Sequence, residues 1–261
     1  MLVIAVATPL AYGRPKSIQQ GKGMATALVT GTSTGIGYAT AIHLARNGYK
    51  TYATMRNLDK GAPLREVAES ESLPLELLAL DVTDETSMSN GVAKVLAADG
   101  RIDVLVNNAG IGEASPLEFL DQALLRNTME TNFFGAVRMM QLVLPCMREQ
   151  QSGTIVNITS LSGLIAFPAH GAYCASKFGL AGFGEALREE LRPHGILVVN
   201  VFPGQVDTGA WDACGLDLAA LGIRREQMME AADVGRALAD AVLRSGSAVP
   251  EELILRPPTG G

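Results

Sequence analysis

The sequence predicts a doubly wound α/β fold, with a seven-stranded parallel sheet and helices on both of its faces. Short apolar runs alternate along the chain with longer amphipathic stretches, which is the pattern of successive βαβ units. The runs are continuously apolar rather than alternating, as expected of strands buried on both faces. A chain of 261 residues, 48% of them hydrophobic, is large enough to bury one such core.

Seven apolar runs are expected to form the strands: Ala25–Val29, Thr51–Met55, Leu75–Leu80, Val104–Val106, Thr154–Ile158, Leu197–Phe202 and Glu252–Leu255. Amphipathic stretches between them predict helices: Ile36–Asn47, Asp84–Ala98, Leu117–Arg148, Tyr173–Leu191 and Ala232–Leu243. Pro145 predicts a late interruption of the longest helix, because proline removes a helix hydrogen bond.

Residues 24–261 are expected to form a single domain, since no repeat, low-complexity tract or linker divides them. Residues 1–23 are interpreted as an N-terminal extension, poorly ordered, because they lack the charged-then-apolar order of a secretion signal. The segment 204–227 is long and irregular, which is typical of a functional loop. It predicts a substrate lid that carries bulky apolar side chains: Trp211, Leu216, Leu218 and Leu221.

The composition favours a cytoplasmic protein without nucleic-acid or membrane partners. The net charge is −6 and the pI about 5.2, so no global attraction to nucleic acid or anionic membrane is expected. No apolar stretch approaches the roughly 20 residues that span a bilayer. The three cysteines, Cys146, Cys174 and Cys214, fit neither a disulfide framework nor a metal site, so reduced thiols and no metal are expected.

A glycine-rich turn, TGTSTGIG, follows the first expected strand and opens the first helix. Gly31, Gly35 and Gly37 permit a tight turn and close backbone approach, while the helix N-terminus offers free N–H groups to a pyrophosphate. The spacing differs from the common G-x-G-x-x-G fingerprint. A turn that uses glycine only for packing therefore remains open for this motif taken alone.

Tyr173 and Lys177 lie four residues apart on an expected helix, so their side chains share a face. An ordinary tyrosine has a pKa of about 10, and a neighbouring ammonium favours the phenolate. Hydride addition to a carbonyl makes its oxygen basic, and the protein must supply the proton. The alternative is an ordinary Tyr–Lys pair on the surface of a helix. Only the surrounding motifs can decide between a catalytic pair and an ordinary one.

Those motifs occur in one order along the chain: TGTSTGIG, then NNAG at Asn107–Gly110, Asn132 in TNFFG, Ser160 closing NITS, Tyr173-x-x-x-Lys177, Pro203–Gly204, and Thr208. Together they resemble the short-chain dehydrogenase/reductase family, from Ala25 to about Pro258. The resemblance implies a Rossmann-type fold and hydride transfer with a nicotinamide dinucleotide.

The resemblance also implies roles for the matching residues. Tyr173 is expected to be the general acid in reduction and base in oxidation. Lys177 lowers its pKa and holds the nicotinamide ribose, Ser160 bonds the substrate oxygen, and Asn132 holds a water in a proton relay. Ser162 competes for the serine role, but its spacing is wrong by two.

The expected cofactor contacts gather at the strand ends and at the glycine turn: Gly31, Thr32, Ser33, Gly35, Ile36, Gly37, Arg56, Asp81, Val82, Asn108, Ala109, Gly110, Tyr173, Lys177, Pro203, Gly204, Val206 and Thr208. Asp81 resembles the family aspartate that contacts adenine; helix capping suits Thr83 or Asp84 better.

The end of the second strand bears on the choice of cofactor. An acidic residue there binds a ribose 2′-hydroxyl, whereas an arginine accommodates a 2′-phosphate. Met55 occupies the acidic position and Arg56 follows it. NADP(H) is therefore the preferred cofactor, with NAD(H) as the alternative; a solvated loop charge is the plain interpretation of Arg56.

The substrate wall is expected from Gly163–Phe167 and the 204–227 segment, which supply apolar side chains and no basic cluster. They favour an apolar ketone, aldehyde or secondary alcohol. YCASKFGL looks similar to the hydroxysteroid and retinol branch of the family, so a steroid- or retinoid-like substrate fits. By analogy with the family, a homodimer or homotetramer is expected.

Other interpretations stay open. Dehalogenases of the family lack this glycine turn, and epimerases share the fold. A catalytically silent NADP(H) sensor on the same scaffold is the alternative from another class. His170 is interpreted as a loop or pocket-wall residue, and His43 and His194 as structural or exposed.

Overall fold

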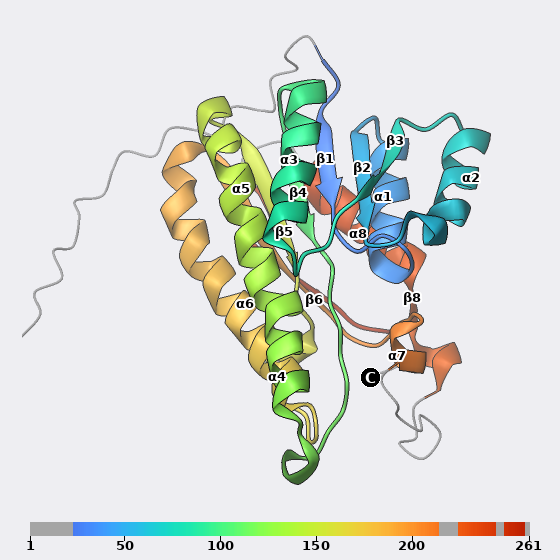
Figure 1. Cartoon of the computed structure of the whole chain (residues 1–261), viewed down its shortest axis with the longest axis vertical. Helices are drawn as coiled ribbons and strands as arrows, with labels where there is room; N and C mark the ends of the chain where they lie inside the picture. The colour runs from blue at the N-terminus through green and yellow to red at the C-terminus, as the bar shows by residue number, and fades with distance from the viewer. Residues whose placement is uncertain (1–22, 214–223, 244–247, 259–261) are drawn as a thin grey trace, which may run out of the picture.

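The computed structural model describes residues 23–213, 224–243 and 248–258 (Figure 1). Seven strands form the main sheet: β1 (Thr26–Val29), β2 (Lys50–Met55), β3 (Leu75–Ala79), β4 (Val104–Asn107), β5 (Gly153–Ile158), β6 (Ile196–Pro203) and β9 (Glu252–Leu255). Two short strands, β7 (Val206–Asp207) and β8 (Met229–Glu230), pair separately.

The main sheet has the order β3-β2-β1-β4-β5-β6-β9, and every neighbouring pair is parallel. This confirms the predicted seven-stranded, doubly wound parallel sheet. The chain winds outward in opposite directions from β1 and β4, so the crevice between their carboxyl ends is the topological switch point where ligands of such folds bind.

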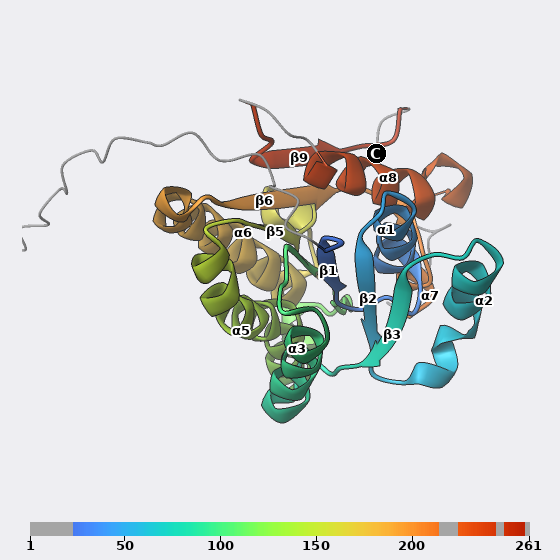
Figure 2. The ribbon, with the colours of Figure 1, turned by 90° about the horizontal axis from the view of Figure 1, so that it is seen from above.

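Eight α-helices lie within the described ranges: α1 (Gly35–Arg46), α2 (Ala62–Ser70), α3 (Glu85–Asp99), α4 (Gln122–Met129), α5 (Gly135–Gln150), α6 (Gly171–Leu191), α7 (Ala210–Ala213) and α8 (Ala231–Leu243). Seen from above, α3, α5 and α6 cover one face of the sheet, and α1, α2 and α8 cover the other (Figure 2). Each face has its own apolar core, with Leu105 and Ile155 in the first and Val106 and Val156 in the second. Burial on both faces is the reason the strands are apolar throughout.

The long helix expected over Leu117–Arg148 is divided, which corrects the sequence-based prediction. A short 3-10 turn at Leu117–Phe119 precedes α4, whose N-cap is Asp121, and five residues of π-helix at Glu130–Phe134 separate α4 from α5. The predicted late interruption is also wrong, since α5 continues through Pro145 to Gln150. The helices α4 and α5 are both amphipathic, so the pattern alone does not reveal the break.

The sequence-based prediction did not include α2, α7 or the β7–β8 pair. The β7–β8 pair brings both ends of the expected lid together, and α7 lies between them. Leu216, Leu218 and Leu221, assigned to that lid, fall outside the described residues, as do residues 1–22 of the expected extension. Within the described ranges, every helix is too short or too polar to span a bilayer.

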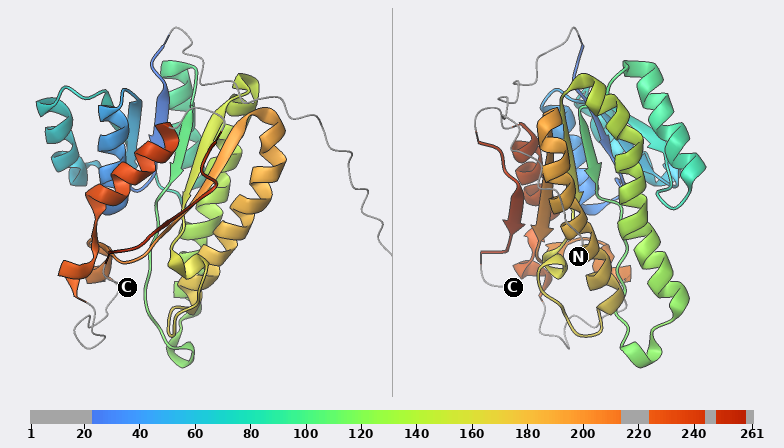
Figure 3. Two further views of the ribbon diagram at one scale, coloured as in Figure 1. Left: turned by 180° about the vertical axis from the view of Figure 1, so that it is seen from behind. Right: turned by 90° about the vertical axis from the view of Figure 1, so that its left-hand side faces the viewer.

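Several segments extend past the carboxyl ends of the strands. The start of α4, the loop before α6, and α7 all project beyond this edge (Figures 1 and 3). The segment that leads into α4 touches the loop before α6, because the Ser115 N–H donates to the Ala169 carbonyl at 2.7 Å. The projecting segments frame the switch point.

Candidate active site at the carboxyl edge of the sheet

The glycine turn between β1 and α1 leaves no room for a side chain at Gly31 or Gly37. Gly31 and Gly35 have φ values of +69° and +65°, in the left-handed region that favours glycine. A β-carbon on Gly31 would lie 2.7 Å from Ala109 Cα, and one on Gly37 would lie 2.5 Å from the Gly31 carbonyl oxygen. Thr34, the N-cap of α1, makes no side-chain cap bond. The first N–H groups of α1 therefore stay available to an anion.

The turn is joined directly to the end of β4. Thr30 Oγ1 donates to the Val106 carbonyl and accepts from the N–H groups of Asn108 and Ala109, both at 3.0 Å. Asn108 Nδ2 donates to the carbonyls of Thr30 and Gly31 at 2.8 and 2.9 Å. The side chain of Asn108 thus holds the shape of the turn, and its neighbours Ala109 and Gly110 line the crevice.

Thr32 also serves the turn. Its side chain is fully buried and donates to the Thr54 carbonyl at 3.1 Å. Ser33 and Ile36 are half-buried beside it, and Ile36 packs against the core under α1. Any contact of Thr32 with a ligand is therefore through its backbone.

The fifth strand and α6 bring three candidate catalytic side chains together. Ser160 follows the end of β5, and its side chain hydrogen-bonds with Tyr173 of α6. Lys177 Nζ lies 5.6 Å from the centroid of the Tyr173 ring and donates to the Ile158 carbonyl at 2.8 Å. Ser162, the competitor for the serine role, is buried, and its N–H donates to Ser160 Oγ at 3.1 Å.

The same group lies against the end of β4. A β-carbon on Gly110 would be 3.5 Å from Lys177 Nζ, and one on Gly112 would be 3.2 Å from the ring of Tyr173. Since Gly110 follows Asn108 and Ala109, the Tyr173–Lys177 pair faces the same crevice as the glycine turn. Residues expected to bind the pyrophosphate and the nicotinamide ribose of a dinucleotide are thus linked by one short segment.

Burial is the main cause of the pKa shifts of Tyr173 and Lys177. Burial lowers the pKa of the Lys177 ammonium to about 8, because a charged group is poorly solvated there. Burial also raises the pKa of the Tyr173 phenol, and the hydrogen bond with Ser160 opposes that rise. The sequence predicted that Lys177 lowers the tyrosine pKa, whereas in this structure the Tyr173 pKa is raised, and the group that opposes the rise is Ser160. Perturbed groups in such a crevice are typical of functional sites.

Asn132 lies in the π-helix between α4 and α5, and its side chain is buried. Its Oδ1 accepts from the Ile111 N–H and its Nδ2 donates to the Ile111 carbonyl, both at 2.8 Å, and also to Ser176 Oγ at 3.0 Å. Single-turn π-helices are frequent at functional sites.

Ser176 was not identified from the sequence. Its Oγ donates to the Tyr173 carbonyl at 2.7 Å and accepts from Asn132, so it connects the π-helix to the helix of Tyr173 and Lys177. Its position between Tyr173 and Lys177 could have drawn attention to it. A buried serine on a helix, however, has no sequence pattern that marks it as functional. Leu117 and Phe119 were missed as well; they are 84% and 76% exposed at the rim.

The remaining expected contacts lie around the crevice. Pro203 ends β6, Val206 begins β7, and Thr208 Cγ2 would be 3.1 Å from a β-carbon on Gly35, so the segment after β6 touches the glycine turn. The Gly204 N–H donates to Leu255.

The other three expected cofactor contacts, Arg56, Asp81 and Val82, follow the ends of β2 and β3. Asp81 Oδ1 accepts from the N–H and hydroxyl of Thr83, Val82 is buried, and Asp84 caps α3 as expected. Arg56 is exposed and pairs with no acidic side chain in the described ranges, whereas Met55 is buried.

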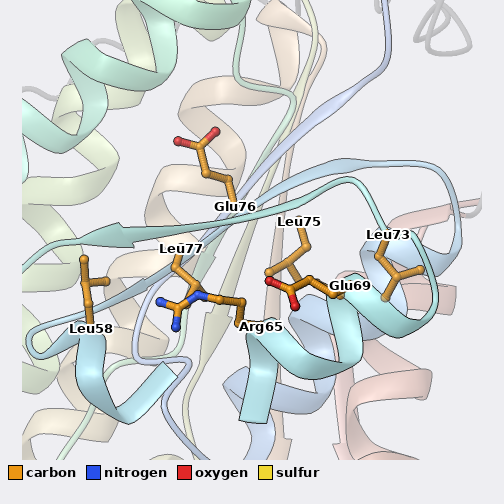
Figure 4. Close-up of a pocket in the computed structure, with 8 residues that line it drawn as sticks. Leu58, Arg65, Glu69, Leu73, Leu75, Glu76 and Leu77 are labelled. Atoms are coloured by element: carbon orange, nitrogen blue, oxygen red, sulfur yellow. The ribbon is translucent and has the colours of Figure 1, made fainter. Parts of the chain in front are cut away.

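These observations fit a bound dinucleotide. Glycines stand in the turn where a pyrophosphate would approach the backbone, the N-cap of α1 makes no side-chain bond, and Arg56 at the end of β2 has no acidic partner among the described residues. A separate groove of about 460 Å³ lies between α2 and β3, lined by Leu58, Arg65, Glu69 and Leu77 among others (Figure 4). It contains none of the expected site residues.

The expected substrate wall is apolar and open. Leu164, Ile165 and Phe167 are 39%, 47% and 42% exposed. Trp211 in α7 donates through Nε1 to the Val206 carbonyl at 2.8 Å. His170 at the start of α6 contacts the Pro168 carbonyl through Nδ1, in keeping with a loop role.

Residues 25–217 match the family described as short chain dehydrogenase. The chain belongs to this family, and the fold and the order of its motifs agree with the match. The resemblance inferred from the motifs is therefore confirmed.

Characterised relatives are similar over the same region. The chain is 39% identical over 185 residues to 3-ketodihydrosphingosine reductase of Bacteroides thetaiotaomicron, covering 71% of this chain and 65% of that protein. It is 43% identical over 188 residues to human retinol dehydrogenase 8, covering 70% and 59%. The aligned region thus spans less than two thirds of these relatives.

Solved structures share the fold. A variant of actinorhodin polyketide ketoreductase with NADPH superposes with a TM-score of 0.82 and 28% identity, covering 89% of this chain and 95% of that chain. A dinucleotide is thus bound by a close structural neighbour.

The hydrogen bonds of Thr30 Oγ1 join the glycine turn to the end of β4. This joint gives a first prediction. Thr30→Val removes the acceptor of two backbone N–H groups, and leaving such groups unpaired costs about 1–3 kcal/mol. We expect a lower free energy of unfolding by about that amount in urea and weaker NADPH binding by fluorescence titration.

Thr40→Val is the matched control. Thr40 is equally buried, but its hydroxyl makes a single bond, to the Ile36 carbonyl within α1. If both variants lose stability equally and neither loses NADPH affinity, the joint does not shape the binding turn.

Proposed function

We propose that this protein is an oxidoreductase that transfers a hydride between NADP(H) and an apolar carbonyl or alcohol, with Tyr173 as general acid and base. The observation that carries the proposal is the convergence of Ser160, Tyr173 and Lys177 beside Gly110, at the same crevice as the glycine turn. Membership of the short-chain dehydrogenase family supports it.

The bound nicotinamide supplies or accepts the hydride. In reduction, the Tyr173 hydroxyl gives its proton to the substrate oxygen as negative charge develops there; in oxidation, the phenolate takes the proton back. Ser160 Oγ hydrogen-bonds the same oxygen and orients it. Lys177, with a pKa of about 8, exchanges protons near neutral pH and stabilises the phenolate by its charge.

Asn132 is proposed to hold the water of a proton relay behind Lys177. Both amide hydrogens of Asn132 are already used, on Ile111 and Ser176. A second lone pair on Oδ1 remains for a water. A β-carbon on Gly110 would be 3.3 Å from this oxygen and 3.5 Å from Lys177 Nζ, so both groups border the same space.

The proposed substrate is an apolar ketone, aldehyde or secondary alcohol. The exposed side chains of Leu164, Ile165 and Phe167 support this, as do Leu117 and Phe119. The names of the relatives, a ketodihydrosphingosine reductase and a retinol dehydrogenase, point to long apolar molecules. A retinoid- or steroid-like shape fits the same surface.

The proposal extends to the domain organisation and the assembly of the protein. Residues 24–261 are taken as one domain with a lid at 204–227, in a cytoplasmic homodimer or homotetramer. Exposed aromatic side chains on the π-helix and α6, Phe134, Phe178 and Phe183, support association through these helices.

Replacing Tyr173 by Phe tests the reaction. Wild type and Tyr173→Phe are assayed by nicotinamide absorbance against long-chain ketones, retinal and steroid ketones with NADPH and NADH. Removing a general acid lowers kcat by about 10²–10⁴-fold, while NADPH binding should be retained.

Tyr49→Phe is the control, because Tyr49 is buried at the opposite, amino end of β2, and it should keep full activity. Full activity in Tyr173→Phe would contradict the assignment. If the wild-type protein binds NADPH but turns over no substrate, the result would favour the alternative function, a catalytically silent NADP(H) sensor.

Arg56 tests the cofactor preference. We expect Arg56→Ala to raise the Kd for NADPH about tenfold or more, since a hydrogen bond to a charged group contributes about 1.5–3 kcal/mol, and to leave the Kd for NADH nearly unchanged. Arg65→Ala removes the same charge from the exposed face of α2 and should change neither. Equal losses for NADPH and NADH in Arg56→Ala would argue against a 2′-phosphate contact.

A further inference from the structure

Three buried asparagines form a row across the centre of the sheet. Asn107, Asn157 and Asn200 are aligned on β4, β5 and β6 and are 4%, 0% and 1% exposed. Asn107 Nδ2 donates to Asn157 Oδ1 at 3.0 Å, and Asn157 Nδ2 donates to Asn200 Oδ1 at 3.3 Å. We call these three side chains the asparagine row. They lie on the face covered by α5 and α6.

Each end of the asparagine row reaches one of these helices. Asn107 Nδ2 also approaches the Ala136 carbonyl of α5 at 3.4 Å, and Asn200 Nδ2 donates to the Ala181 carbonyl of α6 at 2.9 Å. Ala136 is four residues after Asn132, and Ala181 is four residues after Lys177. Both contacts are thus one helical turn from a residue of the proposed site.

The helix α6 approaches the row unusually closely. A β-carbon on Gly184 would lie 2.3 Å from Asn200 Oδ1 and 3.0 Å from Asn157 Nδ2. Glycine at this position, in a helix that it weakens, lets the backbone of α6 rest on the two amides. Gly182 on the same helix has no atom within 4 Å of its β-carbon position.

Stability alone does not account for the row. Asn107 Oδ1 is buried and has no hydrogen-bond partner among the described residues, and an unsatisfied buried polar atom is unfavourable. The next row of the same face, Leu105, Ile155 and Val198, is apolar. Apolar side chains would therefore fill this face equally well. The asparagine amides add directional hydrogen bonds to the carbonyls of Ala136 and Ala181.

We propose that the asparagine row is a positioning device, which sets the seating of α5 and α6 on the sheet and thereby places Asn132, Tyr173 and Lys177 at the strand ends. The inference rests on the proposed function. The three asparagines and Gly184 are positioning residues and do not touch the reacting atoms. They act through contacts that depend on helix seating: Lys177 with Ile158, and Asn132 with Ser176.

Two variants disturb the seating from opposite sides. Gly184→Ala adds a methyl group between α6 and the row, and Asn200→Ala removes the bond to Ala181. Gly182→Ala is the matched control on α6, and the double variant Gly184→Ala/Asn200→Ala tests coupling. Circular dichroism melts establish the folded fraction of each.

Three readouts are taken on the folded proteins. The first is kcat with NADPH and the best ketone. The second is the Kd for NADPH, whose phosphate-binding turn the row does not touch. The third is the pH at which Tyr173 ionises, from ultraviolet difference titration with Tyr173→Phe as the blank. This titration needs no substrate, so it still tests the row if the proposed reaction fails.

We expect each single variant to lower kcat about 10- to 100-fold, the scale of a misplacement of about 1 Å, with a smaller change in the Kd for NADPH, because Tyr173 and Lys177 are only two of its expected contacts. Less burial of Tyr173 should move its ionisation toward the ordinary value. The double variant should be no worse than the worse single variant, because both act through one contact. Gly182→Ala should match wild type in all three readouts.

Wild-type kcat and wild-type Tyr173 ionisation in both folded single variants would overturn the proposal. Losses that multiply in the double variant would also overturn it, since they would show two independent effects. A lower melting temperature with unchanged kcat would assign the row to stability alone.

Discussion

The fold depends on one constraint: seven strands run parallel, so all their carboxyl ends meet at one edge of the sheet. Each strand must be followed by a crossover, and the order of the strands reverses beside β1 and β4. Residues far apart in the sequence are therefore delivered to one crevice. Thr30 and Asn108, 78 residues apart, are hydrogen-bonded, and Ser160 and Tyr173 meet from different elements.

Close approach at this edge has an energetic consequence for Lys177. Its pKa is about 8 in the folded protein, against an ordinary value of 10.5. Below pH 8 the folded state holds a poorly solvated ammonium, which opposes folding. Between about pH 8 and 10.5 the unfolded chain binds more protons at this residue, so the opposition fades as the pH rises. The burial of Lys177 thus lowers the stability of the folded protein. Its place beside Tyr173 is better explained by a role in catalysis than by packing.

Much of this arrangement could be predicted from the sequence, because it depends on local patterns. Continuous apolar runs identified the strands, and glycines with short polar motifs identified the turn and the candidate site. The division of the helix before Pro145 was not predicted, since α4 and α5 are both amphipathic and follow each other without a glycine-rich or proline-rich break. Ser176 and the contact partners of Asn132 depend on how helices are seated on the sheet, which no single-sequence pattern encodes. The desolvation of Tyr173 is likewise a property of packing.

The central claim is that hydride passes between a nicotinamide and a carbonyl carbon held at this crevice. The most direct measurement uses NADPH deuterated at both hydrogens of nicotinamide C4, with an apolar ketone, and mass spectrometry of the alcohol product. The account predicts one deuterium on the carbinol carbon and a hydroxyl hydrogen that comes from water. An alcohol without deuterium at that carbon would contradict it.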